Sequence, residues 1–91
     1  MEKILNYING ELVAPTNGNY LDNYNPSNGE VYSLIPDSEK QDIDNAVAAA
    51  KQAFKSWSKT PKQKRSDILM KLADTIEKYS EELIKAESKD N

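Results

Sequence analysis

The 91-residue chain contains neither cysteine nor histidine. Without cysteine it has no thiol nucleophile, no disulfide and no thiolate ligand for zinc. Without histidine it has no Ser-His or Cys-His relay and no imidazole ligand for a metal. The common nucleophilic and zinc-dependent chemistries are therefore excluded within these 91 residues.

Glycine and long apolar runs are scarce as well. The three glycines form neither GxGxxG nor GxxxxGK[ST], so the chain has no phosphate-binding loop of those kinds. No apolar run is long enough to cross a bilayer, and nothing resembles a secretory signal, so we expect no membrane partner and a cytoplasmic location. With 12 basic and 15 acidic residues the net charge is −3, which argues against a nucleic-acid partner.

Apolar side chains are also few. They make up 37% of the residues, against roughly 45–50% in an average globular domain. A core with so few apolar side chains, in a chain this short, supplies only a few kcal/mol of net stability.

The first 37 residues have the pattern of two β-hairpins. Residues 4–8 and 11–14 are β-prone and flank Asn9-Gly10, which favours a type I′ turn because both central residues need positive φ. Residues 20–25 and 30–35 form the second pair around a turn that contains Pro26 and Gly29. Pro36 cannot donate to a ladder and marks the end of the last strand.

From Ser38 onward the apolar period changes to 3.6, which predicts helices. The first helix is expected over residues 38–58, with Ser38 as N-cap and Gln41 at the capping-box position. Its apolar face consists of Ile43, Val47, Ala50, Phe54 and Trp57.

The second and third helices are expected within residues 60–91. Thr60 is the predicted N-cap of the second, followed by Pro61 and by Gln63 at the box position. A break is expected at Tyr79-Ser80, with Ser80 capping the third helix, because an unbroken helix would be unusually long. The helical pattern continues to Asn91 with neither a Gly C-cap nor a following Pro, so we expect a chain truncated at its C-terminal end.

These patterns predict an α+β fold in which two N-terminal hairpins precede two or three amphipathic helices. The same residues, in the same order, resemble the amino-terminal part of the aldehyde dehydrogenase superfamily. The matching segments are residues 7–11 (YINGE), 24–31 (YNPSNGEV), 43–50 (IDNAVAAA), 53–54, 57, 65, 69, 71–74, 76–77, 87–88 and 90–91. Residues 20–26, 29–32 and 86–90 look most like semialdehyde dehydrogenases of the 2-aminomuconic or 2-hydroxymuconic type.

The resemblance implies a piece of a multi-domain α/β enzyme that oxidises an aldehyde or semialdehyde to a carboxylic acid with NAD or NADP. In the family a Cys thiolate attacks the aldehyde, a Glu activates water and an Asn helps hold the oxyanion. None of those residues, and none of the nucleotide-contacting residues, matches a position in this chain. We therefore name no catalytic and no cofactor-binding residue, and we expect the 91 residues to be inactive alone. The complete enzyme is expected to be a homodimer or homotetramer.

The resemblance also implies a site for a sodium or potassium ion. Its ligands here would be the backbone carbonyls of Asn23 and Tyr24 and the carboxylate of Asp90. Hard monovalent cations prefer oxygen ligands, and this set would join a strand to the end of a helix. The alternative is that Asp90 is only an exposed residue near a helix end.

Other interpretations stay open from the residues alone. The chain could be a free-standing α+β interaction module without catalysis. The pair Asp42/Asp44 has the spacing of cap or solvated charges more than of an acid-base pair. The strand tyrosines are expected to fill half-buried sheet positions and not to form a base-stacking platform. Which aldehyde is used, the choice between NAD and NADP and the oligomeric state are not encoded in a recognisable pattern.

Overall fold

The computed structural model describes all 91 residues and has five strands and three helices. In chain order these are β1 (Glu2–Lys3), β2 (Asn6–Ile8), β3 (Glu11–Val13), β4 (Tyr20–Tyr24), β5 (Val31–Pro36), α1 (Lys40–Trp57), α2 (Lys62–Lys78) and α3 (Ser80–Asp90). The strands form a three-stranded sheet of order β1-β5-β4 and a separate two-stranded sheet of β2 and β3. The predicted α+β class, with hairpins before helices, is confirmed.

The first hairpin has the predicted turn. Strands β2 and β3 are antiparallel, and Ile8 pairs with Glu11 across the two-residue loop. Asn9 and Gly10 have φ angles of 54° and 78°, the positive values that a type I′ turn requires. The prediction of one strand over residues 4–8 is wrong in its extent, because β2 covers only Asn6–Ile8 and the separate strand β1 already ends at Lys3.

Strand β1, which precedes the first hairpin in the chain, pairs with β5. Glu2 lies opposite Ser33 and Lys3 opposite Leu34 in a parallel ladder, which the Ile4 N–H extends by donating to the Leu34 carbonyl at 2.8 Å. Parallel neighbours need a long connection, and the partner here lies some thirty positions along the chain. A local pattern carries no information on such a pairing.

The second hairpin joins β4 and β5 as predicted. Gly29 closes the turn with φ of 73°, and its N–H donates to the Asn25 carbonyl at 2.7 Å. Pro36 is the last residue of β5. The pairing is irregular near the turn: Asn23 faces Ser33, but Tyr24 faces Val31, so Tyr32 is an extra residue in the ladder. This β-bulge bears directly on the site described below.

Helix α1 begins two residues later than predicted, with Glu39 as its N-cap. The Asp42 carboxylate accepts the Glu39 N–H at 2.9 Å and the Thr16 N–H at 2.9 Å. Asp42 is only 5% exposed. Ser38 is not the cap, because its hydroxyl accepts a hydrogen bond from the Asn6 side-chain amide at 2.8 Å instead. The Asp42 carboxylate thus completes the capping box of α1 with Glu39 and also fixes the loop before β4 to this helix.

The predicted caps of the other two helices are wrong as well. Pro61 has a ψ of 142°, so α2 begins at Lys62. The Thr60 hydroxyl does not cap α2, because it donates to the Ser56 carbonyl at the end of α1. The break before α3 is confirmed, but the N-cap is Tyr79, and Ser80 is already helical.

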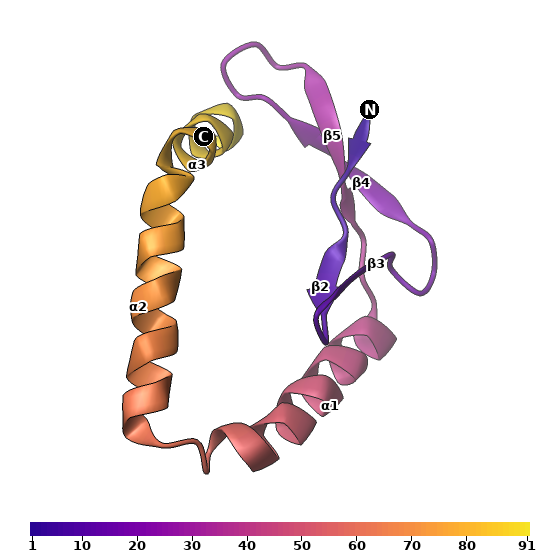
Figure 1. Cartoon of the computed structure of the whole chain (residues 1–91). Helices are drawn as coiled ribbons and strands as arrows, with labels where there is room; N and C mark the ends of the chain where they lie inside the picture. Colours follow the sequence, from indigo (N-terminus) through magenta and orange to yellow (C-terminus); the bar gives the residue numbers. More distant parts are fainter.

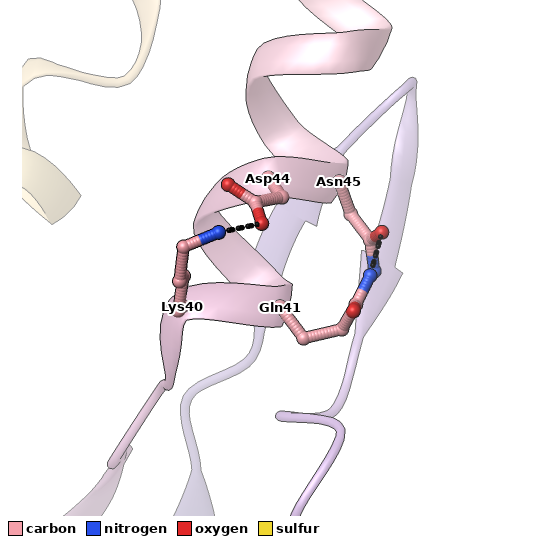
Figure 2. A network of polar contacts seen from close by, with 4 residues as sticks. All are labelled: Lys40, Gln41, Asp44 and Asn45. Atoms are coloured by element: carbon pink, nitrogen blue, oxygen red, sulfur yellow. Dashed lines mark hydrogen bonds and ion pairs between the residues drawn. The ribbon is translucent and has the colours of Figure 1, made fainter.

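On its solvent side α1 carries pairs of the i,i+4 type. The Lys40 ammonium lies 2.7 Å from the Asp44 carboxylate, and the Gln41 amide donates to Asn45 at 2.8 Å (Figure 2). Such exposed pairs contribute a few tenths of a kcal/mol each. Asp42 therefore belongs to the capping box of α1, and Asp44 is a surface charge paired with Lys40.

The chain encloses no apolar core. The only buried residues are Pro15, Ser33 and Asp42. The accessible surface is 7520 Å², against about 5,400 Å² for a compact protein of this mass. The radius of gyration is 16.7 Å, against about 12 Å for a compact chain of this length.

An open arch results from this arrangement. The strands and α1 form one side, α2 forms the other, and α3 returns toward the end of the β4–β5 hairpin (Figure 1). The faces predicted to be apolar are exposed: Phe54 is 65% and Leu69 is 60% accessible. None of the three helices has both the length and the apolar content that crossing a membrane demands.

Replacing Asp42 by alanine is expected to destabilise α1 and the loop before β4, because two backbone N–H groups lose their acceptor. Those hydrogen bonds hold the pKa of Asp42 below its ordinary 3.8. The stabilisation is therefore present above that pH and is lost as the pH falls through the lowered pKa.

Urea titration followed by far-ultraviolet circular dichroism measures the effect. The matched control is Asp44→Ala, which removes a surface ion pair worth at most about 0.5 kcal/mol. The interpretation of Asp42 is wrong if both variants unfold at the same urea concentration at neutral pH.

Candidate functional site

The most developed polar cluster lies where α3 meets the β4–β5 hairpin. We call it the Asp90 junction and define it as Asn23, Tyr32, Ser33 and Asp90. Asp90 Oδ1 accepts a hydrogen bond from Asn23 Nδ2 at 3.0 Å and another from the Tyr32 hydroxyl. Asn23 Nδ2 also lies 3.0 Å from Ser33 Oγ and 3.1 Å from the Tyr32 hydroxyl. Residues up to 67 positions apart in the sequence thus share one network.

The bulge in β5 explains why neighbouring residues reach one partner. Successive side chains of a regular strand point to opposite faces, so Tyr32 and Ser33 would be separated. Because Tyr32 is the extra residue between two ladder pairs, the strand bends there and re-aims its side chain. Ser33, which faces Asn23 in the ladder, is 1% exposed. Within the junction, therefore, the Ser33 side chain is buried and the Asp90 side chain is exposed.

The two ionisable groups of the junction, Tyr32 and Asp90, shift each other's pKa in opposite directions. The hydrogen bond to Asp90 raises the pKa of Tyr32 above 10.0, with smaller contributions from desolvation and the carboxylate charge. The same bond, followed by that from Asn23, lowers the pKa of Asp90 below 3.8. A carboxylate of lowered pKa is a poor base and a phenol of raised pKa a poor acid. The pair therefore joins α3 to the β4–β5 hairpin through a charge-assisted hydrogen bond.

A cavity of about 270 Å³ adjoins the junction. Its lining residues are Glu2, Ile4, Tyr32, Ser33, Ala86, Lys89 and Asp90. The Lys89 ammonium lies 4.7 Å from the centre of the Tyr32 ring, a cation–π contact. Strand β1, the bulge and the last turn of α3 thus meet at one place.

A second hollow runs between the first hairpin and α1. Two adjoining cavities of about 230 and 360 Å³ share Tyr7, Ile8 and Ala46. The lining is mostly apolar, and its one carboxylate, Asp42, is already engaged as the cap. The polar side chains Ser38 and Asp42 in this lining already have partners, because Ser38 accepts from Asn6 and Asp42 accepts the N–H groups of Glu39 and Thr16.

The structure brings two of the three residues of the predicted cation site together. Asn23 and Asp90 are in contact through the Asn23 side chain, and Tyr24 follows Asn23 on β4 with 56% of its surface exposed. The oxygen donors at the junction are one carboxylate and the hydroxyls of Tyr32 and Ser33.

Sequence reasoning missed Tyr32 and Ser33 as members of this site. A tyrosine and a serine in a strand give no signal of a bulge, and the only available hint was the polarity of Ser33 within β5. The expectation that strand tyrosines are half-buried holds for Tyr20 and Tyr32 but is wrong for Tyr7 and Tyr24, which are exposed.

Comparison with known proteins gives a consistent result. The model of the aldehyde dehydrogenase family matches residues 12–91. The chain is 48% identical over 85 residues to 2-aminomuconic semialdehyde dehydrogenase of Bos taurus, covering 93% of the chain and 17% of that protein. It is 45% identical over 86 residues to acetaldehyde dehydrogenase of Pseudomonas aeruginosa, covering 94% and 17%. Against malonate-semialdehyde dehydrogenase 1 of Geobacillus thermodenitrificans it is 40% identical over 91 residues, covering 100% and 19%. The chain thus spans less than a fifth of the length of these relatives.

Replacing Asp90 by asparagine is expected to lower the pKa of Tyr32 toward 10.0, because the anionic acceptor that stabilises the protonated phenol is gone. Phenolate absorbance against pH measures this, and the difference from Tyr32→Phe isolates the Tyr32 contribution. By linkage, the contact stabilises the chain below the raised pKa of Tyr32 and above the lowered pKa of Asp90.

The control for this titration is Glu87→Gln, one turn earlier on α3, whose side chain contacts Asn91 and not Tyr32. An unchanged Tyr32 titration in Asp90→Asn would show that the junction does not form.

Proposed function

The chain belongs to the aldehyde dehydrogenase family, and from that premise we propose that it serves as part of an enzyme that oxidises an aldehyde to a carboxylic acid with NAD or NADP. The observation that carries the proposal is the family match over residues 12–91. The names of its relatives, among them acetaldehyde and semialdehyde dehydrogenases, support the same reaction. A semialdehyde is the substrate class we propose, because several relatives carry that word in their names.

The 91 residues themselves do not fit a nucleotide cofactor. All three glycines lie in turns with φ between 72° and 78°, and none belongs to a phosphate-binding motif. The chain also lacks the cysteine nucleophile that the family resemblance implies. We therefore propose that the segment contributes structure and not chemistry. The apolar faces of α1, α2 and α3 would pack against further parts of a larger enzyme. The cytoplasmic location and the dimeric or tetrameric assembly stay predictions.

Within that enzyme the residues of this chain would hold secondary-structure elements in place and take no part in the reaction. Asp42 joins the loop before β4 to α1, and the Asp90 junction joins α3 to the β4–β5 hairpin. Both contacts fix elements that expose apolar surface. Held in this way, the helices would offer preformed faces to a catalytic part, which lowers the entropy lost on packing.

The first expected outcome is that the 91-residue chain alone does not reduce NAD or NADP in the presence of aldehydes, because it has no thiol nucleophile. A chimera in which this segment replaces the matching 85 residues of the Bos taurus relative is expected to keep that relative's activity. Reduced-nicotinamide absorbance measures both.

The control chimera carries Asp42→Ala and is expected to lose folded yield more than substrate affinity. Turnover by the isolated chain, or a folded but inactive wild-type chimera, would contradict the proposal.

We also propose that the Asp90 junction holds a sodium or potassium ion, with the carbonyls of Asn23 and Tyr24 and the carboxylate of Asp90 as ligands. The proximity of Asn23 on β4 to the Asp90 carboxylate at the end of α3 supports this assignment. Replacing potassium by a bulky organic cation is expected to lower the melting temperature of the chimera. In Asp90→Ala that dependence should disappear, whereas Glu87→Ala should keep it. An equal dependence in Asp90→Ala and the wild type would remove Asp90 from the ligand set.

A further inference from the structure

The sequence contains three Asn-Gly pairs, Asn9-Gly10, Asn17-Gly18 and Asn28-Gly29. In an Asn-Gly pair the glycine nitrogen can attack the asparagine side chain, because glycine has no Cβ to obstruct the approach. All three glycines lie in turns with similar positive φ angles. Sequence therefore does not separate the pairs, and any difference in reactivity must come from their hydrogen bonds.

In two of the pairs, Asn17-Gly18 and Asn28-Gly29, both the asparagine side chain and the glycine N–H make hydrogen bonds. Asn17 Nδ2 donates to the Asp37 carbonyl at 3.1 Å and to Glu39 Oε1 at 2.9 Å. The Gly18 N–H donates to the Pro15 carbonyl at 2.9 Å. Asn17 Oδ1 also accepts the N–H of Asn19.

The Asn28-Gly29 turn is restrained in the same way. Asn28 Oδ1 accepts the Glu30 N–H at 2.9 Å, and the Gly29 N–H donates to the Asn25 carbonyl at 2.7 Å. In both turns a nitrogen that must lose its proton is engaged as a donor, and the amide that must rotate toward it is held.

Asn9-Gly10 differs on both counts. The Asn9 side chain makes no hydrogen bond, and neither does the Gly10 N–H in the two-residue loop between β2 and β3. Both residues are exposed. Opening this loop toward a reactive geometry breaks no contact of the pair itself.

We propose that Asn9 is the site at which the chain deamidates first. The Gly10 nitrogen gives up its proton and forms a bond to Cγ of Asn9, and the side-chain nitrogen leaves as ammonia with the proton. Water then opens the resulting cyclic imide at either carbonyl. The product is aspartate or isoaspartate at position 9, and no oxidant or reductant is involved.

Isoaspartate would alter the groove between the first hairpin and α1. It adds one backbone carbon to a two-residue loop, whose length sets the pairing of Ile8 with Glu11. Asn9 and Gly10 also line the larger apolar cavity beside Ala46 and Ala49. The modification places a carboxylate at the wall of that cavity, so it would loosen the hairpin and charge the groove.

Incubation of the chain at mildly alkaline pH, followed by peptide mapping with mass spectrometry, tests the proposal. Asn9 is expected to deamidate at least about fivefold faster than Asn17 or Asn28, the factor that one ordinary hydrogen bond supports. In guanidinium chloride the three rates should converge, because the flanking glycine is common to all. Sodium sulfate, which favours the folded state, should keep or widen the difference.

Two variants provide matched controls through ammonia release. Asn9→Gly keeps a sequence suited to the type I′ turn and should abolish the early release, whereas Asn28→Ser should leave it nearly unchanged. The proposal is overturned if Asn17 or Asn28 reacts as fast as Asn9 in buffer and in sulfate. It is also overturned if Asn9 keeps its lead in guanidinium, since the selectivity would then not come from the fold.

Discussion

Almost no side chain of this chain is sheltered from water, and its shape therefore depends on hydrogen bonds made across long sequence distances. Only Pro15, Ser33 and Asp42 are buried. Ser33 and Asp42 each lie in a polar network that joins separate elements. Without a buried apolar cluster, these contacts set where the loop before β4 lies against α1 and where α3 lies against the strands.

The open arch and the family membership are physically compatible. Helices gain most of their stability by packing an apolar face, yet the apolar faces of α1 and α2 are largely exposed. The chain spans less than a fifth of its relatives' length. On the proposed function, the same faces that are exposed here would be buried in a larger enzyme. The exposed apolar surface is then an interface and not a defect of the fold.

Local features were predictable from the sequence, and long-range features were not. Asn9-Gly10 and Gly29 defined both hairpin turns because each needs positive φ, and the helical period identified α1 and α2. The predicted N-cap residues are wrong because a hydroxyl near a helix start can hydrogen-bond to a different partner. Ser38 accepts from Asn6, and Thr60 donates to Ser56. Nothing local could reveal that β1 pairs with β5.

The residues of the candidate site were likewise predictable from the sequence only in part. Asn23 and Asp90 were named from the family resemblance, and the structure places them 3.0 Å apart through Nδ2 and Oδ1. Tyr32 completes the junction only because the bulge re-aims it, and the bulge depends on the register of two strands. Register is a property of the paired strands, so residue type alone could not have assigned Tyr32 to the site.

Small-angle X-ray scattering of the 91-residue chain, extrapolated to zero concentration, tests most directly whether polar contacts hold an open arch. The structure has a Cα radius of gyration of 16.7 Å, and we expect a measured value close to it. A value of about 12 Å would show a compact domain, and about 30 Å an unfolded chain. Either of those two results would contradict an arch held by the contacts of Asp42 and Asp90.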